Sequence, residues 1–503
     1  MPDSSEAKYT SKETSLDRKS SETLTKLKLL FEPRSVAFIG ASNDPEKWGF
    51  RILANLIDGG YQGKIYPVNP KGGEILGWQV YATVADIPET PDMAVIVVPP
   101  QQVAGVVREC AAKGVQAGIV ITAGFAETGD EKLEQELADV ARRGGMVLVG
   151  PNSQGIVNTQ AKLYPQIPPL FPQTGHIAAV SQSGAIIGNI CRHLIMRGFG
   201  CSKCISSGNE ADLHTEDYIE YLADDPQTRV MLSYLEGIKD GSRFFKVARE
   251  TSKKKPIVLI KSGETDAGAK AAKSHTSALA GSDAVYQTVF RQTGIIRVRN
   301  LYEMLDTALA FLCHPLPRGR RVGIVASGGG AGVLAADACA KLGLEVVELP
   351  EETIKELDSF MPAWWSRGNP VDLVAGTFGE GPLRALEAVV KSPVTDGVIL
   401  LGLIPAVRPP ARVTEYSSEG DRKRIQDDMV TRLVGLYDRI AEMMKTYGKP
   451  VIIGSELPAV NAAFTQQMNK ALADKNYVCY TMPHEAATAF AMLARYAEFL
   501  NLK

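Results

Sequence analysis

The stretch SVAFIGAS, residues 35–42, sets the pattern of this chain: a short apolar run is followed by a glycine and small residues. A helix is predicted to begin at about Gly49. The same order returns in KIYPVNPK, MAVIVVPP, AGIVITAG and MVLVGPN, with amphipathic stretches such as QQVAGVVRECAAKG between them. Near-continuous apolar strands that alternate with helices are typical of a parallel sheet covered on both faces. A first α/β unit is therefore predicted to close near Asn152.

Two proline-containing connections, YPQIPPLFPQTG and CHPLPRGRR, mark where this pattern starts again. A second unit contains HIAAVSQSGAIIGNI, SKCISSGNE, VMLSYLEGI and PIVLIKSG, and a third contains RVGIVASGGGAGVLAADAC, EVVELP, DGVILLGLI and PVIIGSE. The predicted fold class is α/β, with three consecutive Rossmann-like or flavodoxin-like parallel-sheet domains. The expected divisions are a polar N-terminal arm at 1–28 and domains at 29–152, 153–318 and 319–503.

The composition excludes some broad classes of function. A net charge of -2 argues against a nucleic-acid-binding surface over the whole molecule. No apolar run approaches the roughly 20 residues that span a bilayer. Residues 1–26 are polar and lack the apolar segment of a secretion signal, so we expect a loose tail or an irregular arm there and a cytoplasmic protein.

The seven cysteines do not form the pattern of a disulfide framework in a chain of 503 residues. Cys201 and Cys204 are the one close pair, and a metal knuckle or a redox pair is one interpretation. No second C-x-x-C or paired histidine motif completes a zinc site. The pair also stands at the entry to a predicted buried strand, where cysteine acts as a small hydrophobe. We favour the structural interpretation and predict no metal site.

The glycine-rich turns are candidate ligand sites. GASNDPEKWG, residues 40–49, is a loose relative of a dinucleotide fingerprint, but it is not a G-x-G-x-x-G. The second strand ends in VNPKGG, which presents Asn69 and Lys71 in place of the acidic residue of that fingerprint. A lysine there favours a phosphate-bearing ligand over an unmodified ribose. A simple tight turn between strand and helix remains the alternative.

Two further turns have the composition of anion sites. SQSGA, residues 181–185, and SGGGAG, residues 327–332, each follow an apolar strand and precede a predicted helix. Free amides and the helix dipole at such a terminus favour an anion. One turn of this kind is common and often structural. Two of them, together with an exposed histidine, suggest a phosphate shared between two helix ends.

That histidine is His275, in AAKSHTSALAGSD, residues 271–283. Small residues surround it, and no large apolar neighbour is present to bury it. An imidazole in such a segment suits a group that must be approached closely or must swing. The chain contains no P-loop sequence G-x-x-x-x-G-K-[ST]. If a phosphate reaches His275, its donor nucleotide is expected to be bound by another polypeptide.

The ordered set FEPRSVAFIGAS, YPVNPK, GPNSQGI, SQSGA, SGNEADL, KSHTSALAGSD, ASGGGAGVLAADAC and GNPVDL resembles the α subunit of the ADP-forming acetyl-CoA synthetases. These are NDP-forming acyl-CoA ligases related to succinyl-CoA synthetase. The resemblance covers almost everything from about Leu29 onward. In this family the ATP-grasp domain is on a separate β subunit or fused to the same chain, and the sequence shows no counterpart of it.

The resemblance implies that acyl-CoA and phosphate form an acyl phosphate, whose phosphoryl group passes to a histidine and then to ADP. The histidine that carries the phosphoryl group is His275 here. Glu236 matches the glutamate that orients it, and a carboxylate on one ring nitrogen leaves the other nucleophilic. Glu210 and Asp212 are the alternatives for that role. The family's SHTG is SHTS here, and Ser277 in the glycine position bears on loop mobility.

The resemblance also assigns substrate-binding residues. The phosphate is expected at Ser181, Ser183 and Gly184, with Gly329 and Gly330 opposite. CoA is expected over the first domain, along Gly40, Ser42, Asn69, Lys71, Val98 and Pro99. The thiol is expected to meet the acyl group at Asn152, Ser153 and Gln154.

The expected partner is a β subunit that carries the ATP-grasp domain, ADP or ATP and Mg²⁺, in an α₂β₂ or similar assembly. The co-substrate is a small carboxylic acid, and the sequence does not specify which one. It also leaves open whether the nucleotide is ADP or GDP, the physiological direction of the reaction and the oligomeric state. A CoA-dependent acyltransferase or lyase is the first rival, and a non-catalytic CoA-responsive module the second. The histidine segment, Glu236 and both turns count against them, while a dehydrogenase lacks its fingerprint.

Overall fold

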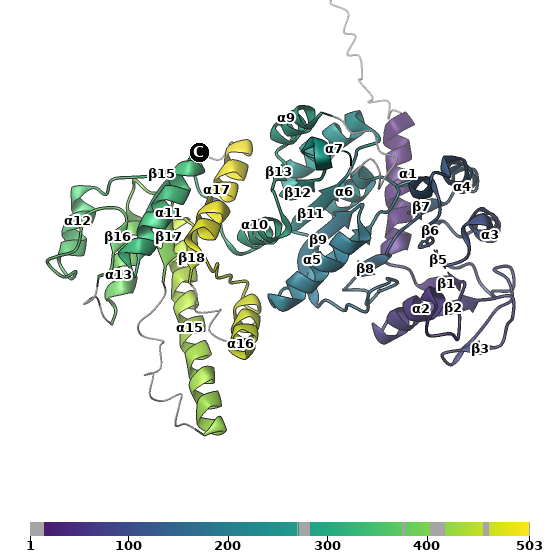
Figure 1. The fold of residues 1–503 in the computed structure, drawn as a ribbon, viewed down its shortest axis with the longest axis horizontal. Helices are drawn as coiled ribbons and strands as arrows, with labels where there is room; N and C mark the ends of the chain where they lie inside the picture. Colours follow the sequence, from purple (N-terminus) through teal and green to yellow (C-terminus); the bar gives the residue numbers. More distant parts are fainter. Residues whose placement is uncertain are drawn as a thin grey trace, which may run out of the picture.

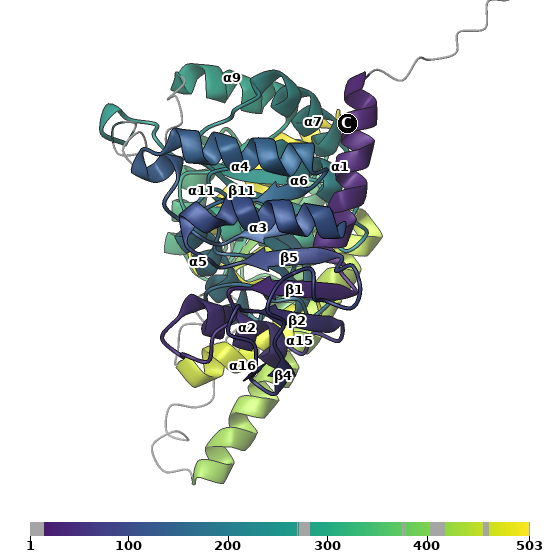
Figure 2. The ribbon, with the colours of Figure 1, turned by 90° about the vertical axis from the view of Figure 1, so that its right-hand side faces the viewer.

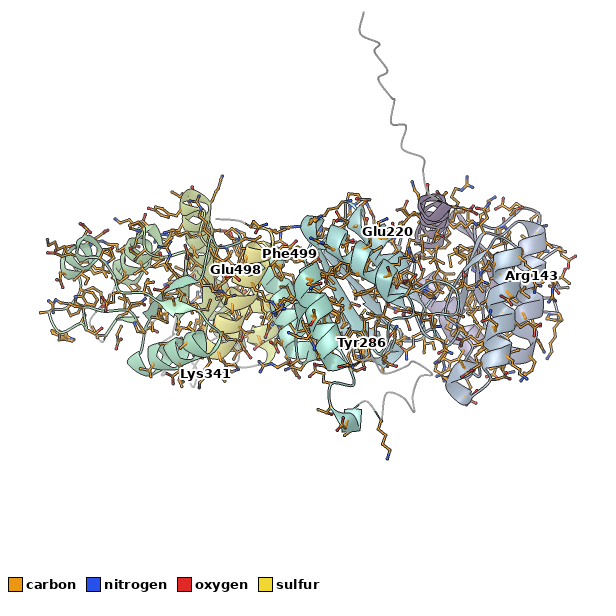
Figure 3. The ribbon with its side chains drawn as sticks, turned by 90° about the horizontal axis from the view of Figure 1, so that it is seen from above. Arg143, Glu220, Tyr286, Lys341, Glu498 and Phe499 are labelled. Carbon is orange, nitrogen blue, oxygen red and sulfur yellow. The ribbon has the colours of Figure 1, made fainter. Side chains whose placement is uncertain are left out.

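The computed structural model describes residues 15–268, 270, 282–374, 377, 379–402, 418–455 and 462–501. Three sheets with their helices form a row along the long axis of the molecule (Figure 1). We call each sheet with its helices a unit, numbered in chain order. Seen from above, Arg143 lies near one end of the row, Glu220 and Tyr286 lie in the middle, and Lys341 lies toward the other end (Figure 3). The predicted α/β class is confirmed, with three consecutive sheets that are mostly parallel.

The first unit contains a five-stranded parallel sheet. Its strands lie in the order β2 (Lys64–Val68), β1 (Ser35–Ile39), β5 (Met93–Ile96), β6 (Ala117–Val120) and β7 (Val147–Val149). A short antiparallel pair, β3 (Glu74–Ile75) and β4 (Trp78–Gln79), lies beside it. The helices of the unit are α2 (Trp48–Asp58), α3 (Pro100–Lys113) and α4 (Glu131–Arg143), and α3 and α4 lie side by side in Figure 2.

Alternate residues of β1 are buried on opposite faces of this sheet. Val36 and Phe38 join the apolar cluster that contains α2, whereas Ala37 and Ile39 join the cluster that contains α3 and α4. Successive side chains of a strand point to opposite faces, so a strand covered on both sides must be apolar at every position. This is why the four residues of β1 that follow Ser35, VAFI, form a continuous apolar run.

The second unit contains a six-stranded sheet. Its order is β13 (Ile296–Arg297), β12 (Ile257–Lys261), β11 (Val230–Leu235), β9 (Thr174–Ser181), β10 (Cys201–Ser206) and β8 (Ile156–Asn158). All neighbours are parallel except β8, which runs antiparallel to β10 at the edge. The helices are α5 (Gly184–Met196), α6 (Thr215–Ala223), α7 (Gly241–Lys254), α9 (Asp283–Thr293) and α10 (Leu301–Cys313).

The third unit contains the parallel strands β15 (Glu345–Val346), β14 (Arg321–Ala326), β17 (Gly397–Leu401) and β18 (Val451–Gly454), with β16 (Val371–Asp372) paired to the end of β14. Its helices are α11 (Gly329–Lys341), α12 (Glu351–Asp358), α13 (Gly381–Lys391), α15 (Glu419–Tyr447), α16 (Ala462–Ala473) and α17 (Pro483–Phe499).

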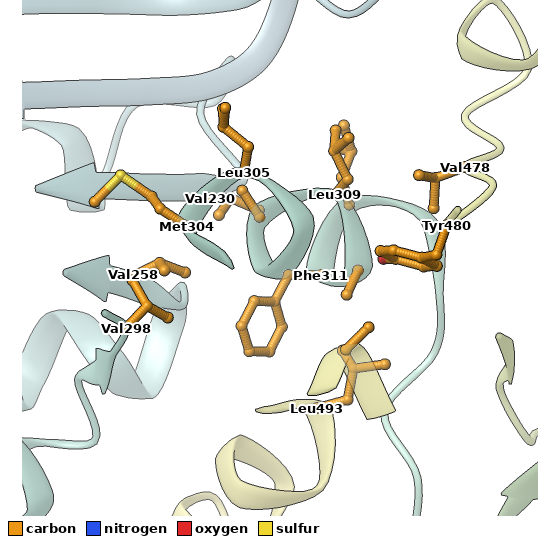
Figure 4. Packing of buried hydrophobic residues seen from close by; sticks show 14 of the residues in the cluster. Val230, Val258, Val298, Met304, Leu305, Leu309, Phe311, Val478, Tyr480 and Leu493 are labelled. Carbon is orange, nitrogen blue, oxygen red and sulfur yellow. The ribbon is translucent and has the colours of Figure 1, made fainter. Parts of the chain in front are cut away.

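Helix α10 joins the second and third units through one apolar cluster. Strand residues such as Val230 and Val258 lie on one side of α10, and Leu493 of α17 lies on the other (Figure 4). The hydroxyl of Tyr480 donates to the backbone oxygen of Asp306 on α10 at 3.1 Å. The core therefore continues across the boundary between these two units.

The N-terminal arm is not irregular throughout, which corrects the sequence-based prediction for part of residues 1–28. Helix α1 (Ser15–Phe31) begins inside this arm. Leu27, Leu30 and Phe31 are fully buried, and the Phe31 ring stacks on Tyr221 of α6 with its centroid 5.1 Å away. Leucines spaced three residues apart form one apolar stripe on a helix. The polar residues around this stripe are the reason why the helix was not predicted from the sequence.

We expect Phe31→Ala to lower the free energy of unfolding by about 3–5 kcal/mol, because the truncation leaves a cavity under α1 and removes the ring stacked on α6. Urea unfolding of the full chain measures this change. Lys28→Ala, one turn earlier on the exposed side of α1, should change it by less than about 0.5 kcal/mol. Equal stability of the two variants would mean that α1 is not part of the core.

Candidate functional site

The residues predicted to contact CoA lie along one edge of the first sheet. They follow the carboxyl ends of β2, β1 and β5, which are neighbours in that sheet. They are Gly40, Ser42, Asn69, Lys71, Val98 and Pro99. In open parallel α/β sheets, ligands bind in the crevice outside these carboxyl ends.

Hydrogen bonds hold the turns at this edge in place. Asn69 Nδ2 donates to the backbone oxygen of Ala41 at 2.8 Å, and Asn69 Oδ1 accepts from the Lys71 backbone N–H at 2.9 Å. Gly40 has φ +93°, and a Cβ there would lie 2.2 Å from the oxygen of Val97. A glycine is therefore required for the close approach of the turn after β1 to the end of β5.

Residues 152–154 connect the first sheet to the second. The Asn152 backbone N–H donates to the oxygen of Thr122 after β6, at 2.8 Å. On the other side, Ser153 Oγ donates to the oxygen of Ser206 at 2.6 Å, and the Gln154 backbone N–H donates to Ser206 Oγ at 2.9 Å. The predicted meeting point of thiol and acyl group thus bridges the carboxyl ends of β6 and β10.

The turn between β9 and α5 carries Ser181, Ser183 and Gly184. Ser181 Oγ accepts from the Ser183 backbone N–H at 3.1 Å, and the Ser183 side chain makes no capping hydrogen bond to the helix. Backbone amides of the first helical turn have no partner within the helix, so such a terminus favours an anion. A Cβ on Gly184 would lie 2.2 Å from Cγ of Gln154, so the junction residue packs directly on this turn.

Gln182, in the middle of the same turn, ties it to Glu236. Gln182 Oε1 accepts from the backbone N–H groups of Glu236 at 2.6 Å and Gly237 at 3.1 Å, and Gln182 Nε2 donates to the oxygen of Gly237 at 2.9 Å. Glu236 follows β11, the strand next to β9, and is buried. The structure therefore brings the predicted orienting glutamate to the predicted phosphate turn.

His275 and Ser277 lie outside the described residues, but the chain on both sides of them is defined. Arg297 Nη2 lies 2.7 Å from Glu264 Oε1, before this segment, and 2.6 Å from Asp283 Oδ1, after it. Arg297 is nearly buried, with a side-chain exposure of 10%. The Arg297 guanidinium therefore links Glu264, which precedes the segment with His275, to Asp283, which follows it.

The same end of the sheet contains a buried lysine. Lys261, the last residue of β12, donates from Nζ to the backbone oxygen of Glu236 at 2.9 Å, and its ammonium lies over the ring of Tyr286. Burial lowers the pKa of Lys261, while the negative charges of Asp283 and Glu236 oppose that shift. The chain flanking the histidine segment is therefore anchored at the Glu236 end of β11.

The second predicted anion turn, with Gly329 and Gly330, begins α11 in the third unit and is exposed. A Cβ on Gly329 would lie 2.8 Å from Asp372 Oδ2, so a carboxylate lies against this helix terminus. The two turns belong to different sheets. Their convergence on one phosphate stays a prediction.

Cys201 and Cys204 lie on β10 and are buried, in agreement with the interpretation as strand residues. A β-bulge between them places both in one apolar cluster with Cys191 of α5, whose Sγ is 3.6 Å from that of Cys204. Within the described ranges, no cluster of three or more His, Cys, Asp or Glu side chains is arranged to hold a metal ion. No helix of that part of the chain is long and apolar enough to cross a bilayer.

Comparison with known proteins identifies the family. Residues 34–159, 174–311 and 322–438 match a CoA binding domain, a succinyl-CoA ligase like flavodoxin domain and a ligase-CoA domain. The chain is 39% identical to the acetate–CoA ligase (ADP-forming) II subunit alpha of Pyrococcus furiosus, over 94% of this chain and 98% of that one. The chain belongs to the family of ADP-forming acyl-CoA ligase α subunits. The resemblance carried by the motifs is thereby confirmed.

A second relative and a solved structure are also similar to this chain. The 4-hydroxybutyrate–CoA ligase (ADP-forming) of Nitrosopumilus maritimus is 34% identical over 94% of this chain but only 64% of its own length. The solved dinucleotide forming acetyl-coenzyme A synthetase 1 of Ca. Korarchaeum cryptofilum, in complex with phosphate and ADP, is 34% identical. It superposes with a TM-score of 0.81, covering 94% of this chain and 97% of its own.

The residues that link the separate loops of the candidate site to one another were not predicted from the sequence. Gln182 lies inside the SQSGA motif, yet its partners come from a different part of the chain. Asn209 was missed as well: its Oδ1 accepts from Asn152 at 3.2 Å, and its Nδ2 donates to Glu134 of α4 at 2.8 Å. The one available signal was the density of polar residues in SSGNE and SQSGA, and it does not specify pairs.

We expect Gly184→Ala to destabilise the chain by about 1–3 kcal/mol, because the added methyl group overlaps Gln154 and forces a shift in a packed region. The double variant Gly184→Ala/Gln154→Ala should recover part of this loss, because it removes Cγ and Cδ of Gln154 but keeps its Cβ, 2.9 Å from the added carbon. A double-mutant cycle of unfolding free energies measures this coupling. Gly241→Ala, at the first position of α7 with open space around its Cβ, is the matched control and should be near neutral. Additive effects would contradict the contact between Gly184 and Gln154.

Proposed function

We propose that this chain is the α subunit of an ADP-forming acyl-CoA ligase, which interconverts acyl-CoA, ADP and phosphate with a carboxylic acid, CoA and ATP. The observation that carries the proposal is the continuity of the site. Residues 152–154 join the proposed CoA edge of the first sheet to the α5 terminus, and Gln182 joins that terminus to Glu236. The 39% identity with an α subunit of this activity supports the same conclusion.

The reaction proceeds in three balanced steps. A phosphate oxygen attacks the thioester carbonyl, the C–S bond breaks, and the CoA thiolate leaves and takes up a proton. A nitrogen of His275 then attacks the phosphorus of the acyl phosphate, and the carboxylate leaves. Finally, a β-phosphate oxygen of ADP takes the phosphoryl group, which forms ATP and restores the imidazole.

The residues at the carboxyl edges of the sheets have separate roles in this reaction. CoA lies against the six residues of the first sheet given above, and its thiol reaches residues 152–154. Ser181, Ser183 and Gly184 hold the phosphate at the α5 terminus, with Gly329 and Gly330 at the α11 terminus. Amides fixed in advance stabilise the charge of the phosphoryl oxygens without reorganisation. Glu236 orients His275, which leaves one ring nitrogen free for attack.

The proposal extends to domains and partner. The domains are 29–152 for CoA, 153–318 for phosphohistidine and 319–503 for the second phosphate turn, with the strands of each sheet falling within one of these ranges. A β subunit with an ATP-grasp domain supplies the nucleotide site and Mg²⁺, in an α₂β₂ or similar assembly. The relative matched over 98% of its length is named a subunit, which supports a separate partner. A cytoplasmic location stays a prediction of the sequence.

The acid is proposed only as a class. Relatives of similar identity are named for acetate and for 4-hydroxybutyrate, so overall similarity to them does not select one acid. A panel of acyl-CoA thioesters, assayed with ADP, phosphate and the chain reconstituted with its ATP-grasp partner, would rank the substrates by kcat/KM.

We expect His275→Ala to abolish formation of a phosphorylated chain from radiolabelled acetyl phosphate, because the acceptor nitrogen is removed. The wild-type label should be acid-labile and base-stable, as a phosphoramidate is. CoA affinity, measured by calorimetry, should stay unchanged. His484→Asn, an exposed histidine on α17, is the control and should label normally. Label retained in the His275 variant would contradict the proposal.

We expect the purified chain to bind CoA and accept a phosphoryl group from acyl phosphate, but not to make acyl-CoA from ATP, acid and CoA. The physical reason is that the nucleotide site is supplied by the partner. Synthesis should begin when an ATP-grasp polypeptide and Mg²⁺ are added, and thioester formation measures it. ATP-dependent synthesis by the single chain, free of any partner, would overturn the assignment of the partner.

A further inference from the structure

Asn209 lies where the first and second units meet. It belongs to the loop that follows β10, and its backbone N–H donates to the oxygen of Pro151 at 3.0 Å. Two residues later, the backbone N–H of Ala211 donates to the oxygen of Gly150, also at 3.0 Å. The loop after β10 therefore runs along the segment that leads from β7 to residues 152–154.

The two segments are in direct backbone contact beside Asn209. Gly208 has φ +62°, and a Cβ there would lie 2.2 Å from the oxygen of Pro151 and 2.8 Å from that of Asn152. Asn152 has a φ of +57°, a conformation that asparagine adopts more readily than most residues. The backbones on both sides are thus fixed, and what remains to be set at this place is the direction of the side chains.

The side-chain amide of Asn209 contacts three side chains from separate segments. Its Nδ2 donates to Oε2 of Glu134 on α4 at 2.8 Å, and to Oε2 of Glu127 in the loop after β6. Its Oδ1 accepts from Nδ2 of Asn152 at 3.2 Å. One amide of the second unit therefore connects two carboxylates to the residue at the predicted meeting point of thiol and acyl group.

The two carboxylates are themselves held in place. Glu127 Oε1 accepts from the backbone N–H of Gly124, while Lys239 Nζ lies 3.8 Å from Glu134 Oε1. Burial works to raise the pKa of Glu127, but the bonds from the Gly124 backbone and the Asn209 side chain outweigh it and lower the pKa. Glu127 is therefore ionised at neutral pH.

These partners fix which way both amides point. An ionised carboxylate can only accept hydrogen bonds, so the nitrogen of Asn209 must face Glu127 and Glu134. Its oxygen must then face Asn152, and Asn152 must present its nitrogen, because two amide oxygens cannot bond to each other. A primary amide has two N–H groups, so Asn152 keeps one of them beyond this bond.

We propose that Asn209 is a positioning residue for the thioester step, which fixes the orientation of the Asn152 amide where the CoA thiol and the acyl group meet. This proposal rests on the proposed function, which assigns residues 152–154 to that meeting point. Negative charge develops on the thioester carbonyl oxygen as phosphate attacks, and a donor already aimed at it lowers the barrier. A turned Asn152 amide would present its oxygen instead. Asn209 itself does not contact the reacting atoms.

The experiment compares two ways of labelling His275 in the full chain. Acetyl-CoA with radiolabelled phosphate must pass through the thioester step, whereas radiolabelled acetyl phosphate enters after it. In Asn209→Ala, the maximal rate of labelling from acetyl-CoA and phosphate should fall on the order of 10- to 100-fold, the scale of a small misplacement of reacting groups. The half-saturating concentration of acetyl-CoA and the rate from acetyl phosphate should stay near wild type. A general loss of structure would lower both rates.

Glu127→Gln tests the orientation itself. The oxygen of the new amide is taken by the backbone of its own loop, so its nitrogen faces Asn209 and favours the turned amide there. The rate from acetyl-CoA and phosphate should therefore fall, but less than in Asn209→Ala, because Glu134 still favours the original orientation. Glu136→Gln, on the exposed side of α4, is the matched control and should change neither rate.

A pair of charge variants tests the contact between Asn209 and Glu127. Asn209→Asp places a third carboxylate beside Glu127 and Glu134, and the repulsion of like charges should lower the rate from acetyl-CoA and phosphate. In the double variant Asn209→Asp/Glu127→Gln, the amide introduced at 127 can donate to the carboxylate introduced at 209. The second oxygen of that carboxylate can accept from Asn152. The double variant should therefore recover part of the rate, and this comparison decides even if Asn209→Ala does not fold.

The outcomes separate this inference from the proposed function. A wild-type rate from acetyl-CoA and phosphate in Asn209→Ala would overturn the inference, and so would equal losses in both reactions or a double variant no faster than Asn209→Asp. A wild-type chain that is labelled from acetyl phosphate alone would place the thioester step elsewhere and overturn it too. No label from either source would contradict the proposed function itself, and the inference with it.

Discussion

Parallel strands that are buried on both faces impose the constraint on which this site depends. Parallel neighbours run in the same direction, so their carboxyl ends all lie at one edge of the sheet. In the second sheet, Ser181, Ser206 and Leu235 therefore come to lie beside one another at that edge. The loops that follow β9, β10 and β11 carry polar residues, and these residues contact one another at this edge.

The constraint explains what could be predicted from the sequence. Continuous apolar runs such as VAFI predict the strands, and the glycine-rich or small-residue turn that opens each unit marks a carboxyl end, so these ends could be placed without a structure. Ser181 and Glu236 lie at the ends of the neighbouring strands β9 and β11 for this reason, while the roles that the resemblance assigned to them stay predictions. Helix α1 was missed because its buried positions, Leu27, Leu30 and Phe31, are a minority among charged and polar residues.

The connections within the site could not be predicted, because they join residues whose proximity depends on the packing of three loops. The Gln182 amide and the Glu236 backbone are 54 residues apart in sequence. Nothing in SQSGA distinguishes a glutamine that caps a local turn from one that bridges to another strand. The same holds for Arg297, whose contacts with Glu264 and Asp283 require both flanks of the histidine segment to be in place. Spacing predicts elements, whereas these bonds depend on tertiary packing.

Energetics favour a functional explanation for the hydrogen bonds of Gln182 over a purely structural one. Removing an amide from water carries a desolvation penalty, and its bonds to the backbone of Glu236 and Gly237 at best offset that penalty. An apolar side chain in the same place would leave the two backbone N–H groups without this acceptor. An amide that accepts from two backbone N–H groups and donates to a backbone oxygen has one orientation, and it fixes the loop after β11 relative to the turn before α5. A contact that adds little net stability but fixes a glutamate relative to a helix terminus suits the proposed phosphoryl-transfer site, since misplaced groups there lower the rate.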